Sequence, residues 1–196
     1  MSTMSPDKEF EFQLHELRYD LAALLCKSLE LVPLITAENA HELQSALSNL
    51  CSEVEHDYVW HSSRALDLAR RSAPLPEACA RRPDEEANRD SDERWSRADE
   101  LTPEGRSAEE LLRELHPEIT ELSASLHEAA AGVARVEALR CRPAADAEQV
   151  ETLLERVHAS ITDAVRLAFS AMRLATWLDR VMDPERWQAE QAERAG

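Results

Sequence analysis

The fold of this chain is decided by residues 146–182, which read DAEQVETLLERVHASITDAVRLAFSAMRLATWLDRVM. Apolar residues recur there at steps of three and four, which places them in one stripe along an α-helix. Asp146, with Gln149 three residues later, matches an N-cap with its capping-box partner. The stripe comprises Val150, Leu154, Val157, Ile161, Ala164, Ala168, Met172 and Ala175. One helix cannot bury such a stripe, so we expect other helices to pack on it.

Two further striped segments lie near the N-terminus, and a short connection joins them. The first is expected to begin at Ser5 and Pro6 and to end before Pro33. The second, capped by Thr36, is expected to run over residues 37–70. A connection this short predicts an antiparallel hairpin. The two stripes are Phe10, Leu14, Leu17, Leu21, Leu24 and Leu25, then Leu43, Leu47, Leu50, Val54, Tyr58, His61, Ala65 and Leu68.

Residues 71–106 differ from the rest in composition. Prolines stand at positions 74, 76, 83 and 103, charged residues dominate, and apolar residues are sparse. Such a segment buries too little surface to offset the entropy of ordering it. We interpret it as a mobile polar crossover between two parts of the chain.

A third helix is predicted after this crossover. Ser107 and Glu110 form an S-x-x-E capping box, and the pattern ends near Arg140. Pro117 lies inside it and predicts a kink or a restart near His116, because proline removes a backbone hydrogen bond. The stripe is Leu112, Leu115, Ile119, Leu122, Leu126, Ala130 and Val133.

Together these segments predict an all-α protein. We expect a four-helix bundle built from two antiparallel hairpins, residues 1–70 and 107–196, joined by the long polar crossover over residues 71–106. Asp183 and Pro184 begin a short C-terminal helix. Only three glycines are present and β-branched runs are absent, which argues against a sheet. Shifting the second helix by 107 positions aligns its apolar residues with those of the fourth, which leaves open both an internal duplication and a chance match.

The charge of the chain excludes some partners. Its net charge is −17, with no basic segment to neutralise phosphates, so we expect no nucleic acid and no anionic membrane as partner. The four cysteines stand far apart, which favours reduced thiols and a cytoplasmic location. Neither a signal peptide nor an apolar run of membrane-spanning length is recognisable.

Two Glu-x-x-His pairs raise the question of a metal site. Glu53 with His56, and Glu155 with His158, resemble in spacing the pairs of ferritin-like di-iron bundles. At about 100° per residue, however, both pairs point away from the apolar stripes of their helices. His61, the one histidine on a core stripe, is interpreted as a half-buried core residue. With no Gly-rich loop and no nucleophile motif either, we expect no metal, no cofactor and no catalytic residue.

A second row of apolar residues follows the last half of the fourth helix. This second seam consists of Leu167, Leu174, Trp177, Leu178 and Val181, three of them spaced by seven. If one stripe per helix is enough for the bundle, a second seam indicates another chain, in the manner of a coiled coil. The open alternative is that the second seam packs inside the same chain.

These observations favour a non-enzymatic cytoplasmic helical-bundle protein of regulatory or adaptor type. It would act through protein–protein interaction or self-association at the second seam. Two alternatives stay open. One is a metal- or cofactor-binding bundle enzyme of ferritin-like type, and the other is an acidic decoy that binds a basic protein surface.

Overall fold

The computed structural model describes residues 6–54, 59–72, 105–140 and 147–194. The prediction of an all-α protein is confirmed for these ranges, which contain no strand. The elements are α1 (Pro6–Glu30), the short 3₁₀ helix η1 (Val32–Leu34), α2 (Ala40–Glu53), α3 (Val59–Ser72), α5 (Ala108–Arg140), α6 (Ala147–Met182) and α7 (Pro184–Arg194). The caps predicted at Ser5 and Asp146, and nearly all of the predicted crossover, lie outside the described residues.

Local sequence explains two of the helix starts. Glu110 accepts a hydrogen bond from the backbone N–H of Ser107 at 2.9 Å, and Ser107 Oγ accepts one from the N–H of Glu110 at 3.3 Å. The predicted capping box is therefore present at the start of α5. The backbone and side-chain bonds from Ser107 hold the pKa of Glu110 below its usual value. At α7, the Asp183 carboxylate accepts the N–H of Arg186 at 3.1 Å and caps that helix.

The second predicted helix is described in two stretches. α2 (Ala40–Glu53) and α3 (Val59–Ser72) both fall within its range, and residues 55–58 between them lie outside the described residues. α2 begins at Ala40, not near residue 37. The predicted apolar positions are well placed, because every stripe residue with a described side chain is buried. Apolar spacing thus reports which face of each helix is covered.

Pro117 does not interrupt α5. The helix is continuous from Ala108 to Arg140 with the proline inside it, so a restart near His116 is wrong. Pro117 cannot donate to the carbonyl of Arg113, but both residues are exposed and water can satisfy that carbonyl. One missing bond at the surface is therefore tolerated by a helix of this length.

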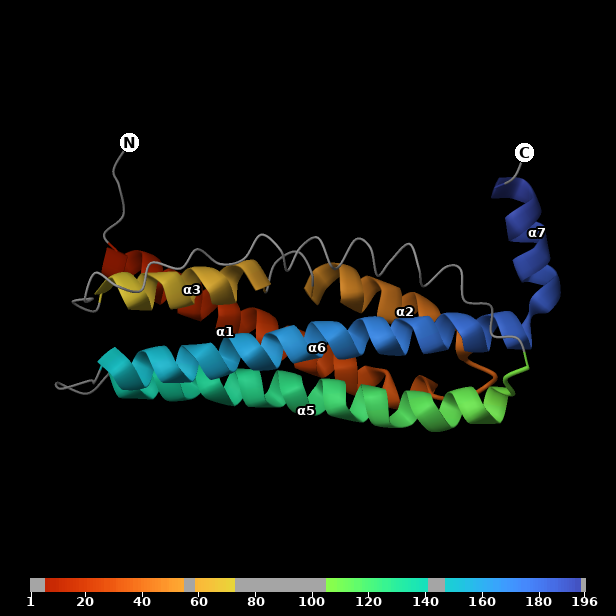
Figure 1. Cartoon of the computed structure of the whole chain (residues 1–196), viewed down its shortest axis with the longest axis horizontal. Helices are drawn as coiled ribbons and strands as arrows, with labels where there is room; N and C mark the ends of the chain where they lie inside the picture. The colour runs from red at the N-terminus through yellow and green to blue at the C-terminus, as the bar shows by residue number, and fades with distance from the viewer. Residues whose placement is uncertain (1–5, 55–58, 73–104, 141–146, 195–196) are drawn as a thin grey trace.

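The long helices lie side by side along the long axis of the molecule (Figure 1). α6 packs most extensively against α5, and also against α2 and α3. α1 packs against α5 and α3. The colour order in Figure 1 shows that α5 runs opposite to α6, and that α1 runs opposite to α2 and α3. α6 consequently has three helical neighbours, and α7 leaves its C-terminal end at a steep angle.

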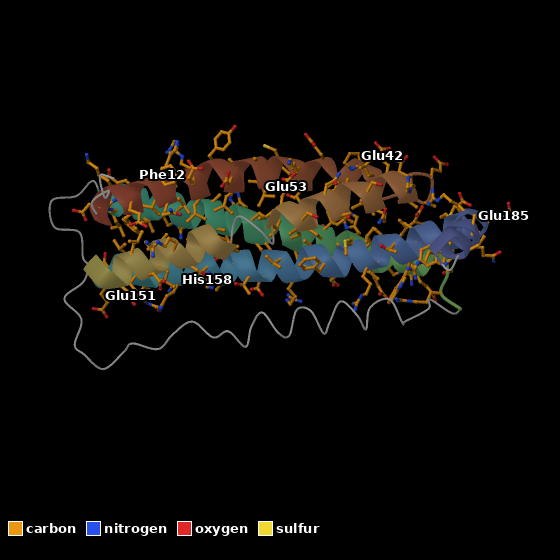
Figure 2. All side chains as sticks on the ribbon, turned by 90° about the horizontal axis from the view of Figure 1, so that it is seen from above. Phe12, Glu42, Glu53, Glu151, His158 and Glu185 are labelled. Atoms are coloured by element: carbon orange, nitrogen blue, oxygen red, sulfur yellow. The ribbon has the colours of Figure 1, made fainter. Side chains whose placement is uncertain are left out.

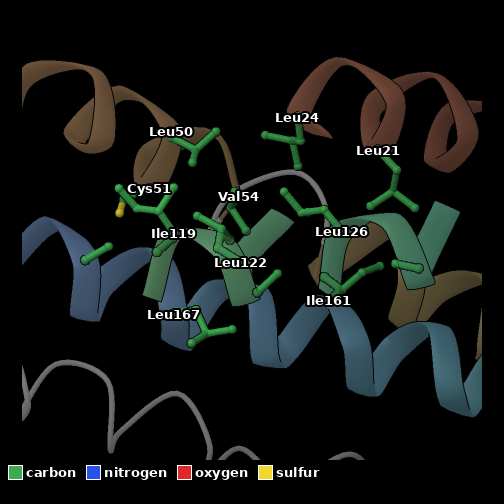
Figure 3. Packing of buried hydrophobic residues seen from close by; sticks show 14 of the residues in the cluster. Leu21, Leu24, Leu50, Cys51, Val54, Ile119, Leu122, Leu126, Ile161 and Leu167 are labelled. Carbon is green, nitrogen blue, oxygen red and sulfur yellow. The ribbon is translucent and has the colours of Figure 1, made fainter. Parts of the chain in front are cut away.

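The core is aliphatic and is shared by α1, α2, α3, α5 and α6. Figure 3 shows leucine, isoleucine and valine side chains converging between the helices, among them Leu24, Leu50, Leu122 and Ile161. The predicted stripe of α5 is displaced by one residue at two positions, where Leu111 and Ala129 are fully buried and Leu112 and Ala130 only half-buried. The displacement follows from the two neighbours of α5, because α1 and α6 together cover a wider face than one stripe.

α5 and α6 approach each other closely at Gly132. A Cβ atom added to this glycine would lie 2.4 Å from Val157 Cγ2 of α6. The absence of a side chain at position 132 is thus what allows the two backbones to come together there. Buried valine is stiff about χ1 and could not move aside cheaply.

Candidate functional site

The second seam is buried within the chain. Leu167, Leu174 and Leu178 belong to the shared core, Trp177 is 9 % exposed, and Val181 is half-buried against the core. The expectation that one stripe suffices for α6 was wrong, because α6 packs against α5 and also against α2 and therefore needs a wider apolar face. A partner binding here would have to displace packing that the chain already makes. A partner-binding role for these five residues stays a prediction.

Two arginines contact the ring of Trp177. The guanidinium of Arg173 lies 5.5 Å and that of Arg106 5.9 Å from the ring centroid. Such cation–π contacts attach the residues just before α5 to the C-terminal half of α6. The guanidinium groups of Arg106 and Arg173 thus both lie near the apolar ring of Trp177.

An exposed apolar row lies on α1 instead. Tyr19 is 72 % exposed, Leu29 56 % and Phe12 49 %. We call it the α1 outer stripe, and it consists of Phe12, His15, Tyr19, Ala22, Cys26 and Leu29, all exposed. Its members are spaced alternately by three and four residues, the heptad spacing of a coiled-coil seam. Figure 2 shows Phe12 at the opposite edge of the molecule from Glu151 and His158.

The sequence contained a signal for the α1 outer stripe. Phe12, Tyr19 and Cys26 recur at seven-residue intervals, as Leu167, Leu174 and Val181 do in α6. Sequence reasoning singled out the row on α6, which the structure buries, and not the row on α1, which the structure leaves exposed. Which of the two rows is covered depends on how many helices pack against each helix. The spacing of apolar residues does not give that number.

The Glu-x-x-His residues take part in local contacts. Lys27 donates to Glu53 at 2.6 Å, and Arg70 donates to Glu155 at 2.9 Å. Ser62 Oγ lies 2.9 Å from His158 Nδ1. No three His, Cys, Asp or Glu residues come together as metal ligands within the part of the chain that the structure describes. His56, and the side chain of His61, lie outside it.

The contact between α3 and α6 is unusually polar. Arg70 of α3 donates to Glu151 and to Glu155 of α6, at 2.9 Å each, and beside them lies the Ser62–His158 hydrogen bond. We call Ser62, Arg70, Glu151, Glu155 and His158 the α3 polar contact. Hydrogen bonds to Glu151 raise the pKa of Arg70, with Glu155 adding to the effect. Burial, and then the charge of Arg70, hold the pKa of His158 below its usual value.

A serine hydroxyl beside a histidine is a possible nucleophile and base. Nucleophilic attack requires that a substrate reach Ser62 Oγ, and Ser62 is 2 % exposed beneath the α3–α6 contact. The pair therefore acts as a buried hydrogen bond between two helices. Its geometry gives no support to hydrolysis.

Comparisons with protein-family models, with curated proteins and with solved structures found no match for this chain. Among the described helices, none is long and apolar enough to cross a bilayer.

Proposed function

We propose that this chain is a non-enzymatic helical-bundle protein that binds a helix of another protein through the α1 outer stripe. The observation that carries the proposal is the exposure of Phe12, Tyr19 and Leu29 in heptad register on one helix face. Single exposed apolar residues are ordinary on protein surfaces. A row that repeats the spacing of a coiled-coil seam from Phe12 to Leu29 is suited to receive a second helix.

The charge around the α1 outer stripe indicates the chemistry of the partner. Glu16 and Glu30 flank it, and Glu11 beside it pairs with Arg140 of α5. Of the nearby cations, Arg18 and Lys27 pair with Glu137 and Glu53 of the same chain, and Lys8 is exposed. A partner helix with Lys or Arg beside its apolar residues would complement these acids. A second copy would bring another net charge of −17 to the contact. We therefore commit to a partner of a different kind, with basic flanks.

The scaffold we propose for this surface is a four-helix bundle. Its four members are α1, α2 together with α3, α5 and α6. The hairpins of residues 1–70 and 107–196 then form one domain. The neighbour relations between these helices support this arrangement. The exposed thiol of Cys26 supports a reducing, cytoplasmic location, because an oxidising compartment would favour its modification.

Photo-crosslinking tests the proposed function. A benzoylphenylalanine replaces Tyr19 in one protein and the exposed Ala134 of α5 in a control, and both are irradiated in a native extract. We expect position 19 alone to yield a cross-linked peptide with an apolar heptad row between Lys or Arg residues. A peptide from this chain itself would identify a second copy as the occupant. Equal cross-linking at positions 19 and 134 would contradict the proposal.

A charge substitution gives the matching loss of function. Phe12→Glu, Tyr19→Glu and Leu29→Glu together place three carboxylates in the contact. Burying unpaired carboxylates costs several kcal/mol, and about 1.4 kcal/mol already weakens binding tenfold. The partner identified above should then be lost with the melting temperature unchanged. The control carries Ala134→Glu, Ala138→Glu and Ala159→Glu, all at exposed positions, and should keep the partner.

A further inference from the structure

α3 is held to the rest of the molecule differently from the other core helices. It has 14 residues, and among its described side chains, those of residues 62–70, the buried apolar ones are Ala65, Leu66 and Leu68. Ala69 packs against the same core, and the other described contacts are polar: the α3 polar contact with α6, and a charge-assisted pair between Arg64 and Glu9 of α1. So short a helix is unstable alone in water, and its structure depends on docking.

His158 occupies the middle of this docking contact. The neutral imidazole has one donor and one acceptor nitrogen, whereas the charged ring has two donors and no acceptor. Charging the ring leaves Nδ1 able only to donate to Ser62 Oγ, so the direction of this hydrogen bond becomes fixed. It also adds a half-buried cation near Arg70, whose own charge is already used by Glu151 and Glu155.

We propose that α3 is a pH-sensitive segment, docked on α6 while His158 is neutral and released when that imidazole takes up a proton. The described charged groups at this contact are Arg70 from α3 and Glu151 and Glu155 from α6, and α1 meets α3 through Glu9, which Arg64 engages. Both α6 carboxylates already bond to Arg70, whose charge offsets theirs in part. The inference is independent of the function proposed for the α1 outer stripe.

The direction of the pH effect follows from linkage. Burial and Arg70 lower the pKa of His158 from its ordinary value of 6.5. A histidine with a lowered pKa in the folded state stabilises the fold fully above the unfolded value. That stabilisation is lost as pH falls from about 6.5 toward the lowered value, because the undocked state then binds the proton more tightly. Acidification, and not alkalinisation, should therefore open α3.

Hydrogen exchange resolved by segment tests this inference at pH 7.5 and pH 5.5, with rates corrected for the intrinsic pH dependence of exchange. We expect residues 62–72 to lose protection on acidification and residues 118–136 to keep it. His158→Asn can still bond Ser62 but does not titrate, so it should abolish the difference. His127→Asn, at an exposed position of α5, should behave as the wild type.

Equal protection of α3 at both pH values would overturn the inference, as would an unchanged acid response in His158→Asn. If His158→Asn fails to dock α3 at pH 7.5, a carbon-detected titration of the wild-type histidines decides. The midpoint of His158 should then lie below 6.5 and coincide with the pH at which α3 loses protection. A midpoint at or above 6.5 would overturn the inference as well.

Discussion

The α5–α6 pair and the α3–α6 contact use the same helix in two different ways. α5 and α6 meet along their lengths through aliphatic side chains and come together most closely where Gly132 faces Val157. α3 meets α6 through an arginine that bridges two glutamates and through a serine–histidine bond. Apolar burial scales with area and responds little to pH or salt, whereas ion pairs respond to both. One core thus combines a part that is insensitive to solution conditions with a part that is sensitive to them.

The largest effect on the free energy of unfolding is expected from a cavity in the α5–α6 pair. Leu122→Ala removes a fully buried side chain and should lower the free energy of unfolding by about 2–5 kcal/mol. Urea denaturation followed by circular dichroism measures the loss. Leu112→Ala, a half-buried leucine of the same helix, should cost clearly less. Equal losses in the two variants would remove the distinction between the core and the edge of this pair.

Adding a side chain at Gly132 should have the next largest effect on the free energy of unfolding. The added Cβ of Gly132→Ala would meet Val157, and overpacking costs about 1–3 kcal/mol. The higher helix propensity of alanine returns about 0.8–1 kcal/mol. The clash is tested by introducing Val157→Ala into the wild type and into the Gly132→Ala variant. In the protein that carries Val157→Ala, Gly132→Ala should be stabilising. If Gly132→Ala costs the same there as in the wild type, Val157 is not the cause of the penalty.

Removing the α5 cap should have a smaller effect. Ser107→Ala loses the bond to the N–H of Glu110 and should cost about 1 kcal/mol in a thermal melt at neutral pH. Ser52→Ala is the control, because Ser52 lies inside α2 and bonds only a backbone carbonyl there. Since the pKa of Glu110 is lowered in the folded state, the contribution of the capping box is present above the ordinary carboxyl pKa. It should disappear as pH falls through the lowered value.

The smallest effect on overall stability is expected from Arg70. Arg70→Met removes two partly exposed ion pairs, each contributing about 0.2–1 kcal/mol, and less at high salt. The loss should appear as faster hydrogen exchange in α3 and not in α5. Arg113→Met breaks an exposed pair within α5 and should leave α3 unchanged. Equal acceleration in α3 and α5 would show that α3 does not open on its own.

Much of this architecture could be predicted because helix periodicity is a local property. Val150, Leu154 and Ile161 are buried as predicted, as are Leu14 and Leu21, since each lies on the apolar face of its helix. The capping box of α5 was equally readable, because its two partners stand three residues apart.

The rest depends on relations between distant parts of the chain. The bond between Ser62 and His158 joins residues 96 positions apart. With 39 acidic and 22 basic residues, no rule of spacing selects Glu151 and Glu155 as the partners of Arg70. The burial of the second seam could not be predicted for the same reason, because covering Leu178 requires helices whose positions only the fold provides.

Denaturant-dependent hydrogen exchange at pH 7.5 tests most directly whether α3 is less stable than the α5–α6 pair, since it assigns a free energy of opening to each segment. We predict the highest values in α5 and α6 around Leu122, Gly132 and Ile161, equal to the global free energy of unfolding. α3 should open at a distinctly lower value and show little dependence on denaturant. If residues 62–72 instead open with the same free energy and the same denaturant dependence as α5 and α6, the whole core unfolds as one unit and the account is contradicted.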